Sequence, residues 1–220
     1  MEGQDMLQDA PSIVGVLFGT IYAPNLTPTH LGHWTDGEII RAIREGVHRS
    51  GRSLIFMPST AFRNLSDDDV QAIVAYLRSQ PPVEPDTPPN RLNVLGAIGA
   101  NFDDPETLQP IFEAQPPVTE PVVAPPVGPT EAYGEYLASY TCPLCHGADL
   151  GGNEAFRAPG LAGVGLTWTE EQFINFMRTG ERPSGPPVDG ELMPWEDLSK
   201  IFEDDDDLRA IFAYLGTLGG

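Results

Sequence analysis

The feature that most constrains the fold of this chain is an internal repeat. Residues 72–79, AIVAYLRS, recur as residues 210–217, AIFAYLGT, 138 positions later. Four further blocks recur in the same order at offsets of 134 to 136. They pair Pro24-Asn25-Leu26 with Pro159-Gly160-Leu161, Trp34-Thr35 with Trp168-Thr169, residues 39–46 with 173–180, and Met57-Pro58 with Met193-Pro194. Ordered self-similarity of this kind predicts two copies of one structural unit.

Each copy is predicted to contain two helices separated by a loop. Thr35 and Thr169 can each cap a helix of about ten residues that has an acidic residue in its first turn. A loop with Met-Pro follows, and a second helix closes the copy. Its apolar residues recur at i, i+3, i+4 and i+7, and they are Val70, Ile73, Val74 and Leu77 in one copy and Leu208, Ile211, Phe212 and Leu215 in the other. The pattern indicates an all-α fold.

Acidic residues gather where these closing helices should begin. Ser66 and residues 67–69 precede one helix, and the run 204–207 precedes the other. A docking patch is one interpretation of the second run. We favour the simpler one, in which carboxylates stabilise the positive end of a helix.

Proline separates the two copies. Residues 81–129 contain 13 of the 23 prolines, a composition that favours polyproline segments and turns over a packed core. We therefore divide the chain into a first copy at residues 1–83, a proline-rich linker at residues 84–129 and a second copy at residues 130–220.

Charge and hydropathy exclude several classes of function. The net charge is −20, with 32 acidic and 12 basic residues, so the chain is not expected to bind nucleic acid or an anionic membrane. Residues 131–220 are the most acidic part, with sixteen acidic and five basic residues. No apolar run is long enough to span a membrane. The first eleven residues have neither the basic start nor the apolar core of a signal peptide.

Both cysteines occur in the segment CPLCH, at Cys142 and Cys145, followed by His146. This spacing is the signature of covalent haem attachment, in which two thiols meet the two vinyl groups and the histidine is an axial ligand. A structural zinc site would need further ligands, usually a second cysteine pair. A thiol redox pair would be expected in a strand–helix pattern that the chain lacks. Met193, in a loop rich in glycine and proline, can supply a thioether as the second axial ligand.

Residues 130–220 resemble class I cytochromes c along their whole length. The resemblance rests on residues 132–140 with Gly134, the CPLCHG segment, residues 159–163, Met193-Pro194 and residues 207–215. It implies that Cys142 and Cys145 hold a haem c covalently. It also implies that His146 and Met193 ligate the iron, while the Pro159 carbonyl accepts the Nδ1 hydrogen of His146.

Residues of the first copy resemble the first domain of multihaem cytochromes c that serve membrane-bound dehydrogenases. The matching segments are NLTP at residues 25–28, FMPST at 56–60 and YLRSQPPV at 76–83. The resemblance thus implies two tandem cytochrome c-like domains, the first lacking its N-terminal helix and haem-attachment segment.

The attachment segment and an export signal are both missing before the first copy, so we expect an N-terminally truncated sequence. In the longer protein Met57 would ligate a second haem. The alternative is a first domain that has lost its haem, in which case Val70, Ile73 and Leu77 would lack a crossing helix and be poorly covered. His30, His33 and His48 are candidate substitute ligands, although ordinary loop histidines are the default interpretation.

Other side chains around a haem are assigned only as groups. The candidate pocket walls are Phe156, Trp168, Phe173, Phe176, Trp195 and Tyr214. The candidate partners of a haem propionate are Arg157, Arg178 and Arg182. Sequence alone does not separate either group from ordinary core and surface residues.

Imidazole and thioether ligands saturate the iron, so the resemblance implies an electron-transfer protein and not an enzyme. The predicted function is to carry single electrons as a relay or subunit between a dehydrogenase and a cytochrome or oxidase acceptor. Its location is expected to be periplasmic or otherwise extracytoplasmic, and its acidity suits a partner with a basic docking surface. One alternative is a peroxidase-like haem enzyme with a second haem in the missing N-terminal part, and another is a Cys/His module without haem.

Overall fold

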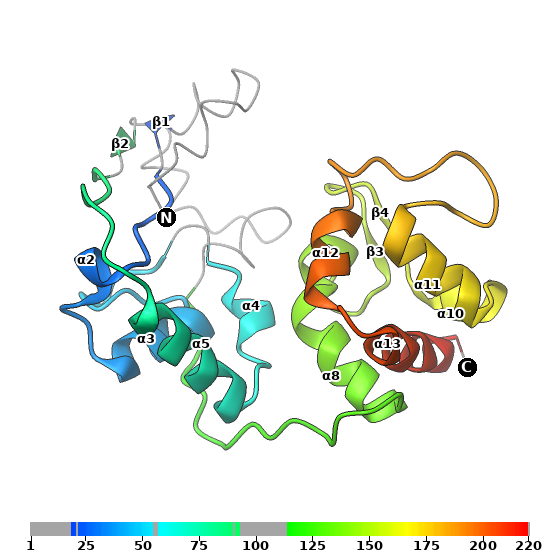
Figure 1. Cartoon of the computed structure of the whole chain (residues 1–220), viewed down its shortest axis with the longest axis horizontal. Coiled ribbons are helices and arrows are strands. Elements are labelled where there is room, and N and C mark those ends of the chain that lie inside the picture. The colour runs from blue at the N-terminus through cyan, green and yellow to red at the C-terminus, as the bar shows by residue number, and fades with distance from the viewer. Residues whose placement is uncertain (1–18, 21, 55–56, 90, 93–113, 220) are drawn as a thin grey trace. The chain divides into compact units, whose positions relative to one another are not determined.

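The computed structural model describes residues 19–20, 22–54, 57–89, 91–92 and 114–219. The backbone separates into two compact units, Met1–Pro121 and Val122–Gly220. Helices dominate the described residues of both units, which confirms the predicted all-α class (Figure 1). None of the helices in these described parts of the chain is long and apolar enough to cross a membrane.

The first unit is built from short helices and one small pair of strands. Its described elements are β1 (Gly19–Thr20), α2 (Pro28–Leu31), α3 (Asp36–Glu45), α4 (Ser59–Phe62), α5 (Asp67–Ser79) and β2 (Arg91–Leu92). Strands β1 and β2 pair antiparallel, with Gly19 opposite Leu92. The buried apolar residues are Leu31, Trp34, Ile39, Ile43, Ala61, Leu65, Val70 and Val74. They come from α2 through α5, so the helices share one core.

A buried polar residue joins the start of the first unit to the chain that leaves α5. Asn25 is fully buried, and its side-chain amide donates to the Val83 carbonyl at 2.8 Å. Its side-chain oxygen accepts from both the backbone and the hydroxyl of Thr27, at 2.9 and 2.7 Å. The Thr27 hydroxyl in turn accepts from the backbone of Val83. These bonds satisfy a polar group that would be costly to bury unpaired.

The second unit contains the CPLCH segment. Its elements are α8 (Glu131–Thr141), α9 (Pro143–His146), β3 (Gly152–Asn153), β4 (Ala158–Pro159), α10 (Ala162–Thr167), α11 (Glu170–Thr179), α12 (Trp195–Ile201) and α13 (Asp205–Thr217). Its buried core comprises Tyr136, Leu137, Leu150, Leu161, Phe173, Phe176, Met177, Phe202, Leu208, Ile211 and Leu215. Strands β3 and β4 form an antiparallel pair of two residues each, too short to be read from sequence periodicity.

The predicted helices recur in both units with matching ends. Helices α3 and α11 are ten residues long, and each begins with a capping box, formed by Thr35 with Glu38 and by Thr169 with Gln172. Each ends at a glycine in the left-handed conformation, Gly46 or Gly180. Helices α5 and α13 are both thirteen residues long.

The closing helices begin as the sequence predicts. The Ser66 hydroxyl caps α5, and the Asp204 carboxylate caps α13 by accepting from the backbone of Asp206. After the cap residue, the first turn of each helix carries three aspartates. Helix capping therefore accounts for the start of the acidic run at residues 204–207.

The two closing helices differ in what covers them. In the second unit α8 crosses α13 so closely that a Cβ added to Gly134 would lie 1.8 Å from the Ala210 carbonyl oxygen (Figure 1). Ala210 is fully buried there, and Ile211 is 2% exposed. The equivalent Ile73 on α5 is 37% exposed.

This difference tests the expectation that three apolar residues of α5 are poorly covered. Ile73 is exposed and Leu77 is half-buried. The expectation is wrong for Val70, which is only 1% exposed. Val70 belongs to the face of α5 that the first unit's own core covers, whereas Ile73 lies outside that face.

We expect Gly134→Ala to lower the free energy of unfolding of the protein by about 1–3 kcal/mol, the usual cost of overpacking. Alanine favours helix intrinsically, so any loss reports the crossing with α13. The measurement is denaturant unfolding followed by helical circular dichroism. Gly216→Ala is the matched control, because a Cβ there has no atom within 4 Å. Equal stability of the Gly134→Ala and Gly216→Ala variants would refute the close crossing.

Candidate functional site

The cysteine segment forms a single turn of helix at the end of α8. Cys142 is the C-cap of α8 and the N-cap of α9. Its backbone N–H donates to the Ala138 carbonyl at 3.0 Å, and its carbonyl accepts from the backbone of His146 at 3.0 Å. Cys145 lies within the same turn, and neither cysteine is in a disulfide. The short helix α9 and its N-cap therefore carry both thiols and the imidazole on one turn.

A hydrogen bond fixes the orientation of the His146 ring. Its Nδ1 lies 2.8 Å from the Pro159 carbonyl oxygen, and the residue is only 8% exposed. Because a carbonyl can only accept, Nδ1 carries the hydrogen. The ring nitrogen left for a metal is therefore Nε2.

The strands β3 and β4 place the Pro159 carbonyl. Pro159 pairs with Gly152 across the two strands. Beside that pair, the backbone N–H of Leu161 donates to the Leu150 carbonyl at 2.9 Å. Leu150 is buried and has a positive φ of 57°, a conformation that costs energy in a leucine and must be held by its surroundings. This small hairpin thus acts as a rigid support for the histidine.

The environment of the thiols does not suit thiol–disulfide exchange. Burial raises the pKa of the Cys142 thiol, although a hydrogen bond with the Thr141 hydroxyl acts in the opposite direction. Burial also raises the pKa of Cys145. Reactive redox cysteines have lowered pKa values, because the thiolate is the nucleophile.

A zinc site also lacks support in the structure. Within the described residues, no three His, Cys, Asp or Glu side chains lie close enough together to hold a metal ion. Cys142 and Cys145 therefore have no further zinc ligands in this part of the chain, whereas structural zinc sites need four.

Met193 lies at the end of the loop that joins α11 to α12. Its backbone N–H donates to the Asp189 carbonyl at 3.0 Å, and its carbonyl accepts from the backbone of Trp195 at 2.7 Å. The half-buried Met193 side chain packs against the apolar core of the second unit, as does Cys142. One apolar cluster therefore contacts both a thiol and the thioether.

These side chains form the donor set that a haem c needs. Cys142 and Cys145 supply two thiols at the required spacing, and His146 supplies an oriented imidazole. Met193 supplies a soft thioether against an apolar core. The residues present therefore fit this group.

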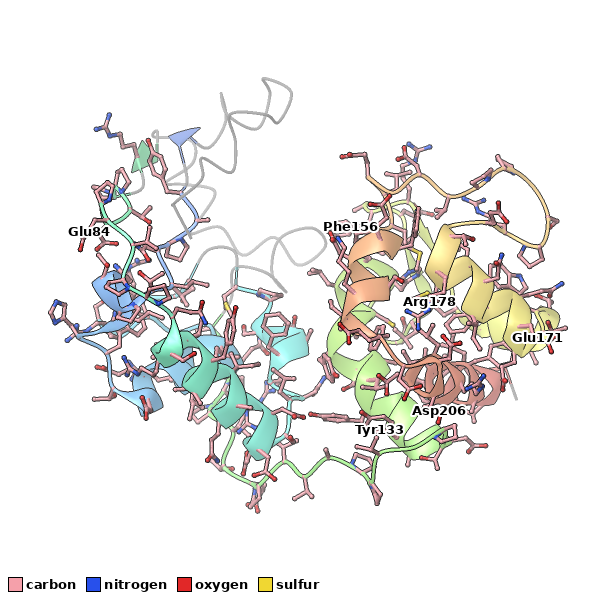
Figure 2. The ribbon with its side chains drawn as sticks, in the orientation of Figure 1. Glu84, Tyr133, Phe156, Glu171, Arg178 and Asp206 are labelled. Carbon is pink, nitrogen blue, oxygen red and sulfur yellow. The ribbon has the colours of Figure 1, made fainter. Side chains whose placement is uncertain are left out.

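Of the six aromatic residues considered as pocket walls, two belong to the buried core. Phe173 is 5% exposed and Phe176 is 8% exposed. Trp168 packs edge-on against Phe176, with ring centroids 5.1 Å apart. Phe156 lies at the surface, 42% exposed (Figure 2), while Trp195 and Tyr214 are half-buried.

Comparisons with known proteins find similarity to subunits of dehydrogenases, including cytochrome c subunits. The chain is 31% identical to one subunit of the nicotinate dehydrogenase of Pseudomonas putida, over 92% of the chain and 18% of that protein. It is 28% identical to the cytochrome c subunit of the quinone alcohol dehydrogenase of Gluconacetobacter polyoxogenes, over 91% of the chain and 48% of that subunit. It is 27% identical to the fructose dehydrogenase cytochrome subunit of Gluconobacter japonicus, over 91% of the chain and 45% of that subunit.

The chain resembles the cytochrome c subunits of dehydrogenases. This confirms the resemblance to the cytochrome c family that the motifs predict, and it favours an electron-transfer component over a catalyst. No family model matches the chain. The chain spans about half the length of the named cytochrome subunits and less than a fifth of the nicotinate dehydrogenase subunit.

The first unit of this cytochrome c-like chain contains a Met-Pro turn like that of the second unit. The backbone of Ser59 donates to the Met57 carbonyl at 2.7 Å, as Trp195 does to Met193. Pro58 and Pro194 have nearly the same backbone angles, with φ −76° and ψ 54° against φ −77° and ψ 63°. Met57 is half-buried. The turn at Met57-Pro58 therefore has nearly the same backbone conformation as the turn at Met193-Pro194.

Of the three histidines in the first unit, His30 and His48 both lie beside the ring of Trp34. His30 Nδ1 lies 3.0 Å from the Asp86 carboxylate. His48 packs edge-on to Trp34 at 4.7 Å and contacts the Ser50 hydroxyl, and burial lowers its pKa. His33 is exposed. Hydrogen bonds and ring contacts account for His30 and His48 as ordinary surface and loop residues.

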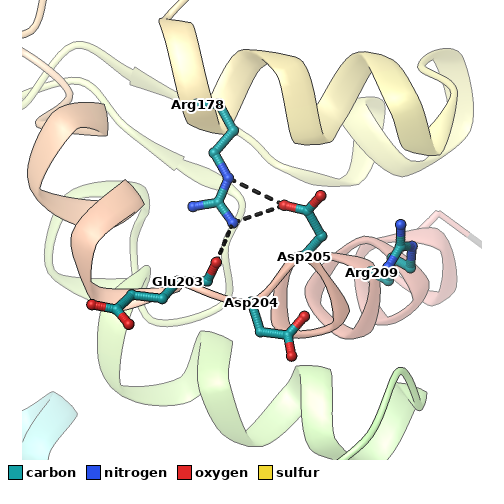
Figure 3. Close-up of a pocket in the computed structure, with 5 residues that line it drawn as sticks. All are labelled: Arg178, Glu203, Asp204, Asp205 and Arg209. Atoms are coloured by element: carbon teal, nitrogen blue, oxygen red, sulfur yellow. Dashed lines mark hydrogen bonds and ion pairs between the residues drawn. The ribbon is translucent and has the colours of Figure 1, made fainter.

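The arginines proposed as propionate partners also differ. Arg157 and Arg182 are exposed, whereas Arg178 bonds Asp205 and backbone carbonyls at the end of α12. An open surface hollow lies at this corner, lined by Arg178, Glu203, Asp204, Asp205 and Arg209 (Figure 3). None of these residues supplies a thiol, imidazole or thioether, so the hollow shares no residue with the candidate site. Sequence reasoning missed the structural role of Arg178, although its recurrence as Arg44 in the repeat was a usable signal.

Proposed function

We propose that the second unit carries single electrons through a haem c bound covalently to Cys142 and Cys145, with His146 and Met193 as axial ligands. The observation that carries this proposal is the His146–Pro159 hydrogen bond beside the two thiols. Bound haem c supplies a one-electron iron couple. The resemblance to dehydrogenase cytochrome subunits supports the same assignment.

The protein's own residues would set the properties of that couple. The Pro159 carbonyl holds the imidazole in one orientation and increases its basicity as a ligand. The thioether of Met193 and the apolar core around it favour the reduced state and raise the potential. If His146 and Met193 both ligate the iron, they would leave no position for a substrate, so an electron carrier is favoured over a peroxidase-like enzyme.

We propose that the chain comprises a partial cytochrome c-like domain at residues 1–83, a joining segment at residues 84–129 and a complete domain at residues 130–220. The repeated helix caps and methionine loops support the relation of the two domains. The sequence has no cysteine besides Cys142 and Cys145. A second covalent haem, with Met57 as ligand, would therefore need thiols from another part of a longer protein.

The partners are proposed from the relatives and from chemistry. Relatives named as cytochrome subunits of alcohol, fructose and gluconate dehydrogenases support a role as subunit or relay between a dehydrogenase and a downstream cytochrome or oxidase. Covalent haem attachment takes place outside the cytoplasm, so we propose an extracytoplasmic location, such as the periplasm. The excess of acidic residues in the second unit suits a basic surface on the partner.

Met193→Ala should abolish the methionine–iron charge-transfer band at the red end of the visible spectrum. It should also lower the potential by a sizeable part of the roughly 0.8 V over which axial ligands set haem potentials. Optical spectroscopy and redox titration of the matured protein measure both effects. Met57→Ala is the matched control, since it makes the same substitution in the equivalent Met-Pro turn of the first unit. It should change neither the band nor the potential. A Met193→Ala variant that keeps the band and the potential would rule out Met193 as a ligand.

Small redox ions of opposite charge test the influence of the acidic surface on docking. We expect the electron-transfer rate with a cationic ruthenium ammine complex to fall severalfold as ionic strength rises from about 0.01 M to 1 M, where the screening length shortens from about 30 to 3 Å. The rate with anionic ferricyanide should rise over the same range. Stopped-flow kinetics measure both rates. Two rates that are both insensitive to salt would show that the acidic residues do not act at the haem.

A further inference from the structure

Arg178 joins three elements of the second unit. It lies in the last turn of α11, and its Nη1 donates to the Phe202 and Ser199 carbonyls at 2.6 and 2.9 Å. Its Nη2 donates to the Glu203 carbonyl at 3.1 Å and to the Asp205 carboxylate at 2.8 Å (Figure 3). Asp205 is the first residue of α13. The guanidinium therefore satisfies carbonyls at the end of α12 and pairs with a carboxylate at the start of α13.

The N-terminal end of α12 packs against the C-terminal end of α11, close to Arg178. Gly180 ends α11 with a φ of +73°, and a Cβ added to it would lie 2.5 Å from Trp195 Nε1. Trp195, the first residue of α12, thus packs directly on this glycine. The Val188 N–H also donates to the Gly180 carbonyl at 2.8 Å. Met193 is two residues before Trp195, so its backbone is held by a helix that α11 contacts at both ends.

The same arginine pairing recurs in the first unit. Arg44 is 6% exposed, and its Nη1 donates to the Asp67 carboxylate at 2.7 Å. Its Nη2 donates to the Leu65 carbonyl, just before α5. Asp67 is the first residue of α5, as Asp205 is of α13. In both units an arginine from the end of one helix thus spans the segment that carries the methionine and bonds the start of the closing helix.

We propose that Arg178 is a positioning residue that holds the Met193 thioether in place as an iron ligand, and that Arg44 has the equivalent position relative to Met57. This inference rests on the proposed function of the second unit. A planar guanidinium has five donors in a fixed fork and can bond the carbonyls of α12 and the Asp205 carboxylate at once, whereas the three donors of a lysine ammonium can replace only part of these bonds. Loss of these bonds would free the C-terminal end of α12. The loop before its N-terminal end, which carries Met193, would then be held less firmly.

The test uses the matured full chain and the variants Arg178→Gln, Arg178→Lys and Arg209→Gln. Arg178→Gln should lose at least half of the methionine–iron band at a temperature where helical circular dichroism is unchanged, and its potential should fall. Its ferrous form should bind carbon monoxide severalfold faster, because the thioether is more easily displaced. Arg178→Lys should recover part of the band. Arg209→Gln is the matched control, because Arg209 lines the same hollow but pairs with the exposed side chains of Glu170 and Asp206, and it should behave as wild type.

Two outcomes would overturn the positioning role. One is a full band, unchanged potential and unchanged carbon monoxide rate in Arg178→Gln, with only a lower unfolding midpoint. The other is an equal loss of band in Arg209→Gln. If Arg178→Gln does not mature, Asp205→Asn removes the partner carboxylate and should show the same partial loss of the band; an unchanged band there overturns the role as well. Failure of the proposed function is distinct, because the wild-type protein would then lack the band.

Discussion

The hydrogen bond between His146 Nδ1 and the Pro159 carbonyl is the contact on which the proposed site depends. It is 2.8 Å long and links a helical turn that follows α8 to a two-stranded hairpin thirteen residues later. Without it, the imidazole could rotate and either ring nitrogen could carry the hydrogen. With it, Nε2 is directed away from the hairpin support, and the thiols of the same turn are fixed relative to it. The rest of the second unit supports this arrangement, since α13 crosses α8 at Gly134 and the apolar core contacts both Cys142 and Met193.

The duplicated architecture separates what belongs to the scaffold from what belongs to the haem. Capping boxes, left-handed glycines, methionine loops and arginine–aspartate pairs are present in both units, whereas the chain's cysteines occur only in the second. The common features therefore build a helix–loop–helix frame that presents a methionine. The α5 surface at Ile73 stays exposed where α13 is covered by α8, which shows how much of the second unit's core comes from that one helix.

Local signals in the sequence predict much of this structure. Thr35 and Thr169 cap helices of ten residues as predicted, because capping depends on residues within one turn. The spacing of Cys142, Cys145 and His146 predicts covalent haem attachment, because two thiols at this spacing can meet the two vinyl groups. Arg178 could not be assigned from its own surroundings, because its partners are 21 to 27 residues away along the chain. The burial of Val70 beside the exposure of Ile73 likewise depends on which elements pack on α5, and the hairpin strands are too short to show a period.

Covalent attachment of one haem to Cys142 and Cys145 is the central claim, and it is tested most directly on purified protein made with an export signal and the haem-attachment machinery. The measurement is the haem content per chain in alkaline pyridine, before and after extraction with acidified organic solvent. The account predicts one c-type haem per chain that remains with the polypeptide after extraction. Colourless protein, haem that is fully extracted, or zinc in place of iron would contradict it.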